Sequence, residues 1–124
     1  MTFEQQIENA ALMLSQLSGS PLHRVIQLSA LVAEFIARMT GFADLSRISV
    51  SHLASSDVYE TIKIGADIME AELRQLELDR LRRLEPWWRS FQNELAAFRG
   101  NPTRESLARA ETAYLAFRTR LLDD

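Results

Sequence analysis

A chain of 124 residues with 47% hydrophobic and 25% charged residues has the size and composition of one globular domain, residues 1–124, with one core. Its formal net charge of -3 gives no overall attraction to phosphate backbones, so we expect no nucleic-acid partner. The absence of cysteine excludes disulfides, thiolate nucleophiles and Cys-ligated zinc. The first residues lack a signal-peptide pattern, and the most apolar stretch, Leu28 to Met39, is shorter than the roughly 20 residues that cross a bilayer. We therefore expect a soluble, cytoplasmic protein with no membrane partner.

The N-terminal third of the chain predicts two helices. The first is expected from about Thr2 to Leu17, because apolar residues recur there at three- and four-residue steps. Gly19, Ser20 and Pro21 then suit the end of one helix and the start of the next. We expect this second helix to run to about Thr40 and to stop at Gly41. Its apolar arc is wide enough to require more than one neighbour, which predicts a place in the middle of a bundle.

The segment from Phe42 to Ser56 is rich in serine and is ambiguous. Ile48, Val50 and His52 alternate with serines as a strand would. No second strand is available to pair with it, so a loop that carries a short helix is the favoured interpretation. A loop, a short helix and a strand all remain open from the sequence.

A long helix is predicted from Asp57 to Arg99. Asp57 and Glu60 have the spacing of a capping box at its start. Pro86 is the one break signal, so we expect a kink there or two helices that meet near Glu85. Its expected buried stripe consists of Ile62, Ala66, Met69, Leu73, Leu76, Leu84, Trp87, Phe91, Leu95 and Phe98.

The last helix is expected to follow the break at residues 100–103. Thr103 can cap it, and it should end near Leu122. Leu107, Ala110, Tyr114, Phe117 and Leu121 form its predicted buried face. The whole pattern predicts an all-α fold, a helical bundle of about four main helices.

Residues that could carry chemistry do not form a recognisable set. His23 and His52 are the two histidines, and neither has the Glu three residues before it that a di-iron bundle uses. No serine lies in a Gly-x-Ser-x-Gly context, and the four glycines are too far apart to hold a phosphate. We therefore expect no enzymatic activity, no metal and no cofactor.

One surface of the expected long helix carries the functional prediction. At 100° per residue, the stripe from Ile62 to Phe91 defines the core side of that helix. Leu78, Leu81 and Trp88 fall off this stripe, on the side that carries charged residues. An exposed apolar patch with a charged rim is typical of a protein-binding surface. The predicted partner-binding residues are Arg74, Leu78, Leu81, Arg82, Glu85 and Trp88.

These residues predict a regulatory or adaptor protein of bacterial type that works through another protein. It could sequester a transcription factor or serve as a chaperone. A homodimer built on the same helix is also expected, with each patch meeting its own copy. Two alternatives stay open: another helix of the bundle covers the patch, or the bundle holds a small apolar ligand or lipid between its helices.

Overall fold

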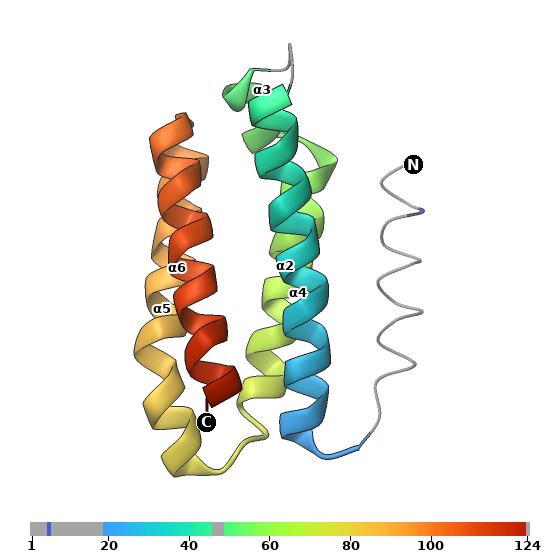
Figure 1. Cartoon of the computed structure of the whole chain (residues 1–124), viewed down its shortest axis with the longest axis vertical. Helices are drawn as coiled ribbons and strands as arrows, with labels where there is room; N and C mark the ends of the chain where they lie inside the picture. Colours follow the sequence, from blue (N-terminus) through green and yellow to red (C-terminus); the bar gives the residue numbers. More distant parts are fainter. Residues whose placement is uncertain (1–4, 6–18, 46–48, 124) are drawn as a thin grey trace.

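The computed structural model describes Gln5 and residues 19–45 and 49–123. These residues form helices and contain no strand, which confirms the all-α prediction for this part of the chain. The helices are α2 (Pro21–Leu45), α3 (Val50–Ala54), α4 (Asp57–Leu73), α5 (Leu78–Gly100) and α6 (Arg104–Asp123), as Figure 1 shows. The helix expected between Thr2 and Leu17 lies outside the described residues except for Gln5, so this prediction is not tested.

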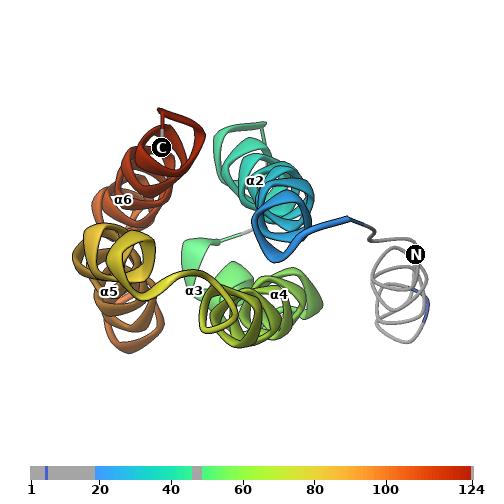
Figure 2. The same ribbon diagram turned by 90° about the horizontal axis from the view of Figure 1, so that it is seen from below.

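The four long helices run alternately up and down, and seen end-on they stand at the corners of a bundle (Figures 1 and 2). The closest pairings are α5 with α6 and α2 with α4, followed by α2 with α6. The short helix α3 packs against α2 and α4 at one end. Because α2 contacts α3, α4 and α6, the prediction that its wide apolar arc meets several neighbours is confirmed.

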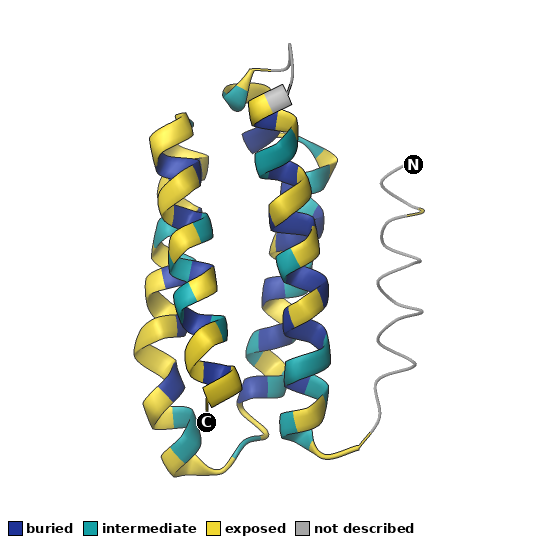
Figure 3. Cartoon of the chain, viewed as in Figure 1, coloured by how far each residue is buried: buried dark blue, intermediate teal, exposed yellow. Residues whose placement is uncertain are grey.

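The core lies between the four long helices, where the buried residues face inward (Figure 3). An aromatic cluster joins α5 to α6: the ring of Trp88 lies 5.4 Å from that of Phe91 and 5.0 Å from that of Phe117, centroid to centroid. The ring of Tyr114 meets that of Phe91 edge-on at 4.8 Å. Aromatic pairs at these separations and tilts add to the stability that their burial provides.

The helix α2 does not stop at Gly41, so that prediction was wrong. It continues to Leu45, and Met39 and Ala43 extend its buried face at 1% and 2% exposure. Burial of these side chains offsets the roughly 1 kcal/mol that glycine costs inside a helix. By length and composition alone, residues 21–44 could also cross a membrane, although this helix packs within the bundle here.

The serine-rich segment contains the short helix that the sequence favoured. Residues 42–45 belong to α2, and α3 occupies Val50–Ala54, where the strand interpretation had placed Val50 and His52. Ile48, the third residue of that alternation, lies outside the described residues. Ser49 caps α3 by accepting a hydrogen bond from the amide of His52, and Ser56 caps α4 by accepting one from the amide of Tyr59. The serines thus serve as helix caps.

The single long helix predicted from Asp57 to Arg99 is two helices, and the chain turns at residues 74–77. Here the amides of Gln75 and Leu76 bond to carbonyls only three residues back, as in a tightening last turn. At 1.5 Å per residue, one straight helix over residues 57–99 would span about 65 Å, too long for both ends to lie in one small core. The turn brings Leu73 and Leu84 into the same core.

Pro86, where a kink or a junction was expected, lies inside α5, which continues through it to Gly100. The missing amide deprives the carbonyl of Arg82 of its helical donor. Both residues are exposed, so water can satisfy that carbonyl. The start of α6 agrees with the prediction: Thr103 Oγ1 accepts from the amide of Ser106 at 2.9 Å, and Ser106 Oγ accepts from the amide of Thr103 at 2.9 Å.

Candidate functional site

The start of α5 projects from the end of the bundle. In Figure 1 its first turns reach lower than the last turn of α4. Glu77 occupies the N-cap position without a side-chain capping bond, and Leu78 follows with 59% of its surface exposed. Leu81, one turn later, is half-buried against the core. Leu84 and Trp88 are fully packed and fix this helix on the bundle. An apolar side chain therefore stands in solvent on a well-supported helix.

The structure brings four of the six predicted partner-binding residues together beside this projection. Arg74, Leu81, Glu85 and Trp88 line a hollow of about 90 Å³ between the C-terminal end of α4 and α5, with Glu70 and Leu73. The other two, Leu78 and Arg82, are exposed on the first turns of α5. We call these six predicted residues, with Glu70 and Leu73, the α4–α5 surface.

Trp88 is not exposed as predicted, because 97% of its surface is buried in the aromatic cluster with Phe91 and Phe117 (3% exposed). Trp87, predicted to be buried, is 36% exposed and packs under the guanidinium of Arg120 at 4.4 Å. Adjacent residues lie 100° apart on a helix, so only one of the two tryptophans can face the core fully, and Trp88 is the one that packs against Phe91 and Phe117. Trp88 therefore forms the wall of the hollow rather than its exposed centre.

Charges of both signs surround the hollow. Arg74 lies 3.8 Å from Glu70, and Arg89 pairs with Glu85 along α5. Arg82 and Glu77 form no ion pair within the part of the chain that the structure describes. Among the residues that the structure describes, none accepts a hydrogen bond from the buried Nε1–H of Trp88. The surface thus has an apolar floor, a charged rim and two charges of opposite sign that are open to a partner.

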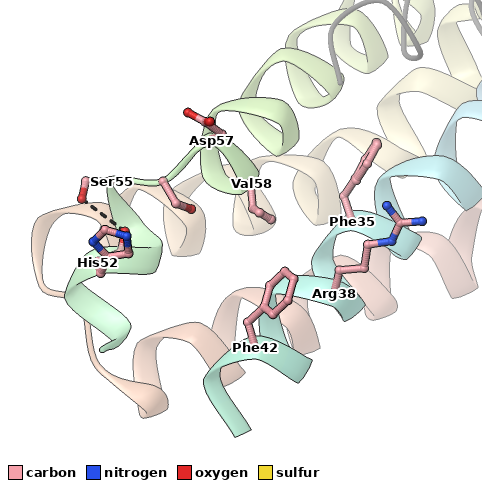
Figure 4. Close-up of a pocket in the computed structure, with 8 residues that line it drawn as sticks. Phe35, Arg38, Phe42, His52, Ser55, Asp57 and Val58 are labelled. Carbon is pink, nitrogen blue, oxygen red and sulfur yellow. Dashed lines mark hydrogen bonds between the residues drawn. The ribbon is translucent and has the colours of Figure 1, made fainter. Parts of the chain in front are cut away.

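A second and larger hollow of about 500 Å³ lies where the end of α2 meets α3 and α4 (Figure 4). Its apolar part is formed by Phe35, Phe42 and Val58, and Phe42 is 44% exposed. Arg38, His52, Ser55, Ser56 and Asp57 complete its lining. This hollow could not be predicted from the sequence, because its residues come from three helices and hydrophobic periodicity does not show how helices pack against one another.

The histidine, serine and aspartate in this lining do not form a nucleophilic set. The Ser55 hydroxyl donates to the backbone carbonyl of His52 at 3.2 Å, which Figure 4 shows as a dashed line, and not to the imidazole. Asp57 points away from Phe35 and Phe42 (Figure 4). Activation of a serine requires a base within hydrogen-bonding reach of its hydroxyl, and this arrangement lacks one. Among the residues that the structure describes, no three His, Asp or Glu side chains gather as a metal site would require.

The two hollows suit different occupants. The hollow of the α4–α5 surface, about 90 Å³, is well below the roughly 300–1,000 Å³ of small-molecule sites, whereas the one beside α3 lies within that range. The smaller hollow has room for part of one side chain from a partner protein. Comparison of this chain with family models, curated proteins and solved structures found no match.

Proposed function

We propose that this protein is a non-enzymatic regulator or adaptor that binds another protein through the α4–α5 surface. The observation that carries the proposal is the exposure of Leu78, 59%, on a projecting helix beside an apolar hollow with a charged rim. Apolar centres ringed by charged residues are typical of protein interfaces. A cytoplasmic location is part of the proposal, with sequestration of a transcription factor or a chaperone role as the two forms we consider.

The floor of the hollow favours binding because it is already in place. Trp88 is held by its packing on Phe91 and Phe117, so its side chain loses little conformational freedom when a partner arrives. An apolar partner side chain in the hollow would contact Leu73, Leu81 and Trp88 and would displace water from them. The exposed arginines on the rim supply the directional contacts that fix a partner's orientation.

The test is affinity capture from the native host with wild-type protein and with Leu78→Glu as bait. Leu78 is exposed, so its substitution leaves the core intact, whereas a change at Trp88 would damage the fold. Leu115→Glu, at an exposed leucine on α6, is the matched control. We expect one specific protein to be captured by the wild type and the control and lost from Leu78→Glu. Equal capture by all three folded baits would contradict the proposal.

The larger hollow supports a second candidate function, the binding of a small apolar ligand or lipid. Its volume of about 500 Å³ and the exposed ring of Phe42 favour this candidate. A fluorescent apolar probe should bind saturably to the wild type and much more weakly to Phe42→Ser, while Leu115→Ser should bind as the wild type does. Absence of saturable binding to the wild type would exclude this candidate.

A further inference from the structure

An apolar strip continues from the hollow beside α3 along the outer side of α4. Ile64 and Ile68 follow Asp57 of the hollow by seven and eleven residues, so both lie within about 20° of it on the helix. Both are half-buried, and both lie about 120° or more from Ile62, which faces the core. The outer strip comprises these two isoleucines and the apolar lining of the hollow: Phe35, Phe42, Val58, Ile64 and Ile68.

The chain before α2 carries a matching apolar face. On the helix that the sequence predicts from Thr2 to Leu17, five apolar residues fall within an arc of about 80°. They are Phe3, Ile7, Ala10, Leu14 and Leu17. Gln5, the one residue of this segment that the structure describes, is helical and exposed, and its position is about 160° from that of Phe3. A helix with this pattern needs an apolar surface to cover its face.

The start of α2 allows this segment to fold back along the bundle. Gly19 has a φ of +89°, which favours glycine, and a Cβ there would lie 3.1 Å from the ring of His23. Ser20 then caps α2 by accepting a hydrogen bond from the amide of His23 at 3.3 Å. The backbone bends at both residues, immediately before the helix begins.

We propose that residues 2–17 pack on the outer strip as a helix antiparallel to α2, with the ring of Phe3 in the hollow beside α3. The lengths match: residues 3–17 and residues 21–35 each span about 21 Å as helix, so the fold-back brings Phe3 level with Phe35. Figure 1 shows that α2 runs from its start to the end of the bundle that carries α3. The hollow, about 500 Å³, has room for an aromatic ring.

The covalent connection favours this occupant over any other. Two residues join the segment to α2, so its effective concentration at the strip is on the order of millimolar. A Cβ on Gly65 of α4 would lie 3.1 Å from Val32 of α2, which sets the level of α4 against α2. Ile7, one turn after the residue in the hollow, then comes between Ile64 and Ile68.

This packing makes the hollow a site that the chain itself occupies. An apolar ligand, the second candidate function, has to displace Phe3 before it can bind. The α4–α5 surface takes no part, so the regulatory function and this packing stand or fall separately.

Paramagnetic broadening of backbone amide NMR signals in the full chain tests the packing. The chain has no cysteine, so Gln5→Cys carries a nitroxide label at one position. A packed segment should broaden the amides of Phe35 and Ile64 strongly and that of Arg24, about 17 Å back along α2 from Phe35, much less. A segment held only at Gly19 would broaden the amide of Arg24 most, and that result would overturn the proposal.

Substitutions on the two sides of the segment identify the face that packs. In the labelled chain, Phe3→Ser with Ile7→Ser should abolish the broadening of Phe35 and Ile64, because the apolar face is lost. Leu12→Ser, about 180° from Phe3, is the matched control and should keep it. Circular dichroism verifies that each variant folds. Equal broadening in all the labelled chains would contradict the proposed face.

A mixture of spin-labelled chain with isotope-enriched chain that carries no spin label shows whether the contact lies within one chain. No broadening in the mixture supports the proposal. Broadening there would mean that the segment of a second copy occupies the strip, which overturns it. If the segment packs and no apolar probe binds even to Phe3→Ser, the packing stands and the second candidate function fails.

Discussion

The hydroxyl of Tyr114 on α6 donates a 2.7 Å hydrogen bond to the backbone carbonyl of Ser29 on α2. Both residues are completely buried, at 0% exposure. The bond crosses the seam between the α5–α6 pair and the α2–α4 pair, so it joins the two halves of the bundle. Burial raises the pKa of Tyr114 well above its usual value, and the positive charge of Arg118 lowers it to a smaller extent.

Tyr114→Phe should lower the free energy of unfolding by about 1 kcal/mol at neutral pH, because it removes one buried hydrogen bond and keeps the ring. The folded pKa of Tyr114 lies above its unfolded value of about 10. Its contribution to stability is therefore complete below pH 10 and is lost as the pH rises from there toward the folded pKa. Urea denaturation from pH 8 upward should show this loss in the wild type and a smaller one in the variant. Burial also raises the pKa of Tyr59, although Arg99 and Lys63 lower it to a smaller extent. Tyr59 therefore still causes some loss of the free energy of unfolding with rising pH in the variant. If the free energy of unfolding fell equally with pH in the wild type and in Tyr114→Phe, Tyr114 would not cause the loss of stability at alkaline pH.

Two helical glycines should respond oppositely to alanine. A methyl group on Gly41 would meet nothing within 4 Å, so Gly41→Ala should gain the roughly 1 kcal/mol of helix propensity. On Gly65 the same methyl would lie 3.1 Å from Cγ2 of Val32, a fully buried side chain in α2. That contact should cancel the gain or reverse it, since overpacking costs energy. Thermal unfolding of both variants measures the difference, and a stabilised Gly65→Ala would show that α2 and α4 separate readily.

The helical content of the fold follows from the sequence, but one chain reversal does not. Residues 100–103 contain Gly, Asn and Pro, and the break there is where the sequence predicts it. The turn at residues 74–77, Arg-Gln-Leu-Glu, contains no residue that breaks a helix. All four have good or ordinary helix propensity, so the reversal is imposed by burial of Leu73 and Leu84 in one core. The opposite holds at Gly41 and Pro86: both residues disfavour a helix, yet packing against the bundle keeps α2 and α5 helical there.

The error in the candidate site concerns the two adjacent tryptophans of α5. Leu84, Phe91, Leu95 and Phe98 were predicted to be buried and are buried, but Trp87 was placed in this stripe where Trp88 belongs. The buried stripe of α5 is Leu84, Trp88, Phe91, Leu95 and Phe98. Steps of three and four result whether Trp87 or Trp88 is included, so periodicity alone does not distinguish the two. The exposed Leu78 and Arg82, and the hollow itself, depend on where α4 ends, which periodicity alone does not give.

Pro86→Ala should stabilise the protein. Proline inside a helix costs up to about 3 kcal/mol relative to alanine, because it lacks the amide donor and crowds the preceding turn. α5 continues through Pro86, and the residue is exposed, so no buried contact is lost with the ring. We expect the free energy of unfolding to rise by about 1–3 kcal/mol in urea titrations. Destabilisation would mean that the proline sets a bend in α5 that the packing against α6 requires.

The adjacent tryptophans provide the sharpest test of the helical phase of α5. Trp88→Ala removes a side chain that is 97% buried (3% exposed) and should lower the free energy of unfolding by about 3–5 kcal/mol. That is a large share of the roughly 5–15 kcal/mol by which a typical domain is stable.

Trp87→Ala removes a partly exposed ring and its contact with Arg120, which is worth about 0.5–1 kcal/mol. Fluorescence distinguishes the two tryptophans with Phe substitutions, which keep most of the side-chain volume. Trp88→Phe should leave the longer-wavelength emission of the more exposed Trp87, and Trp87→Phe should leave the shorter-wavelength emission of the buried Trp88. If Trp87→Ala were the more damaging change, the stripe through Leu84 and Phe91 would be misplaced. The hollow at the start of α5 would then lose Trp88 as its wall, and the α4–α5 surface would lose its preformed floor.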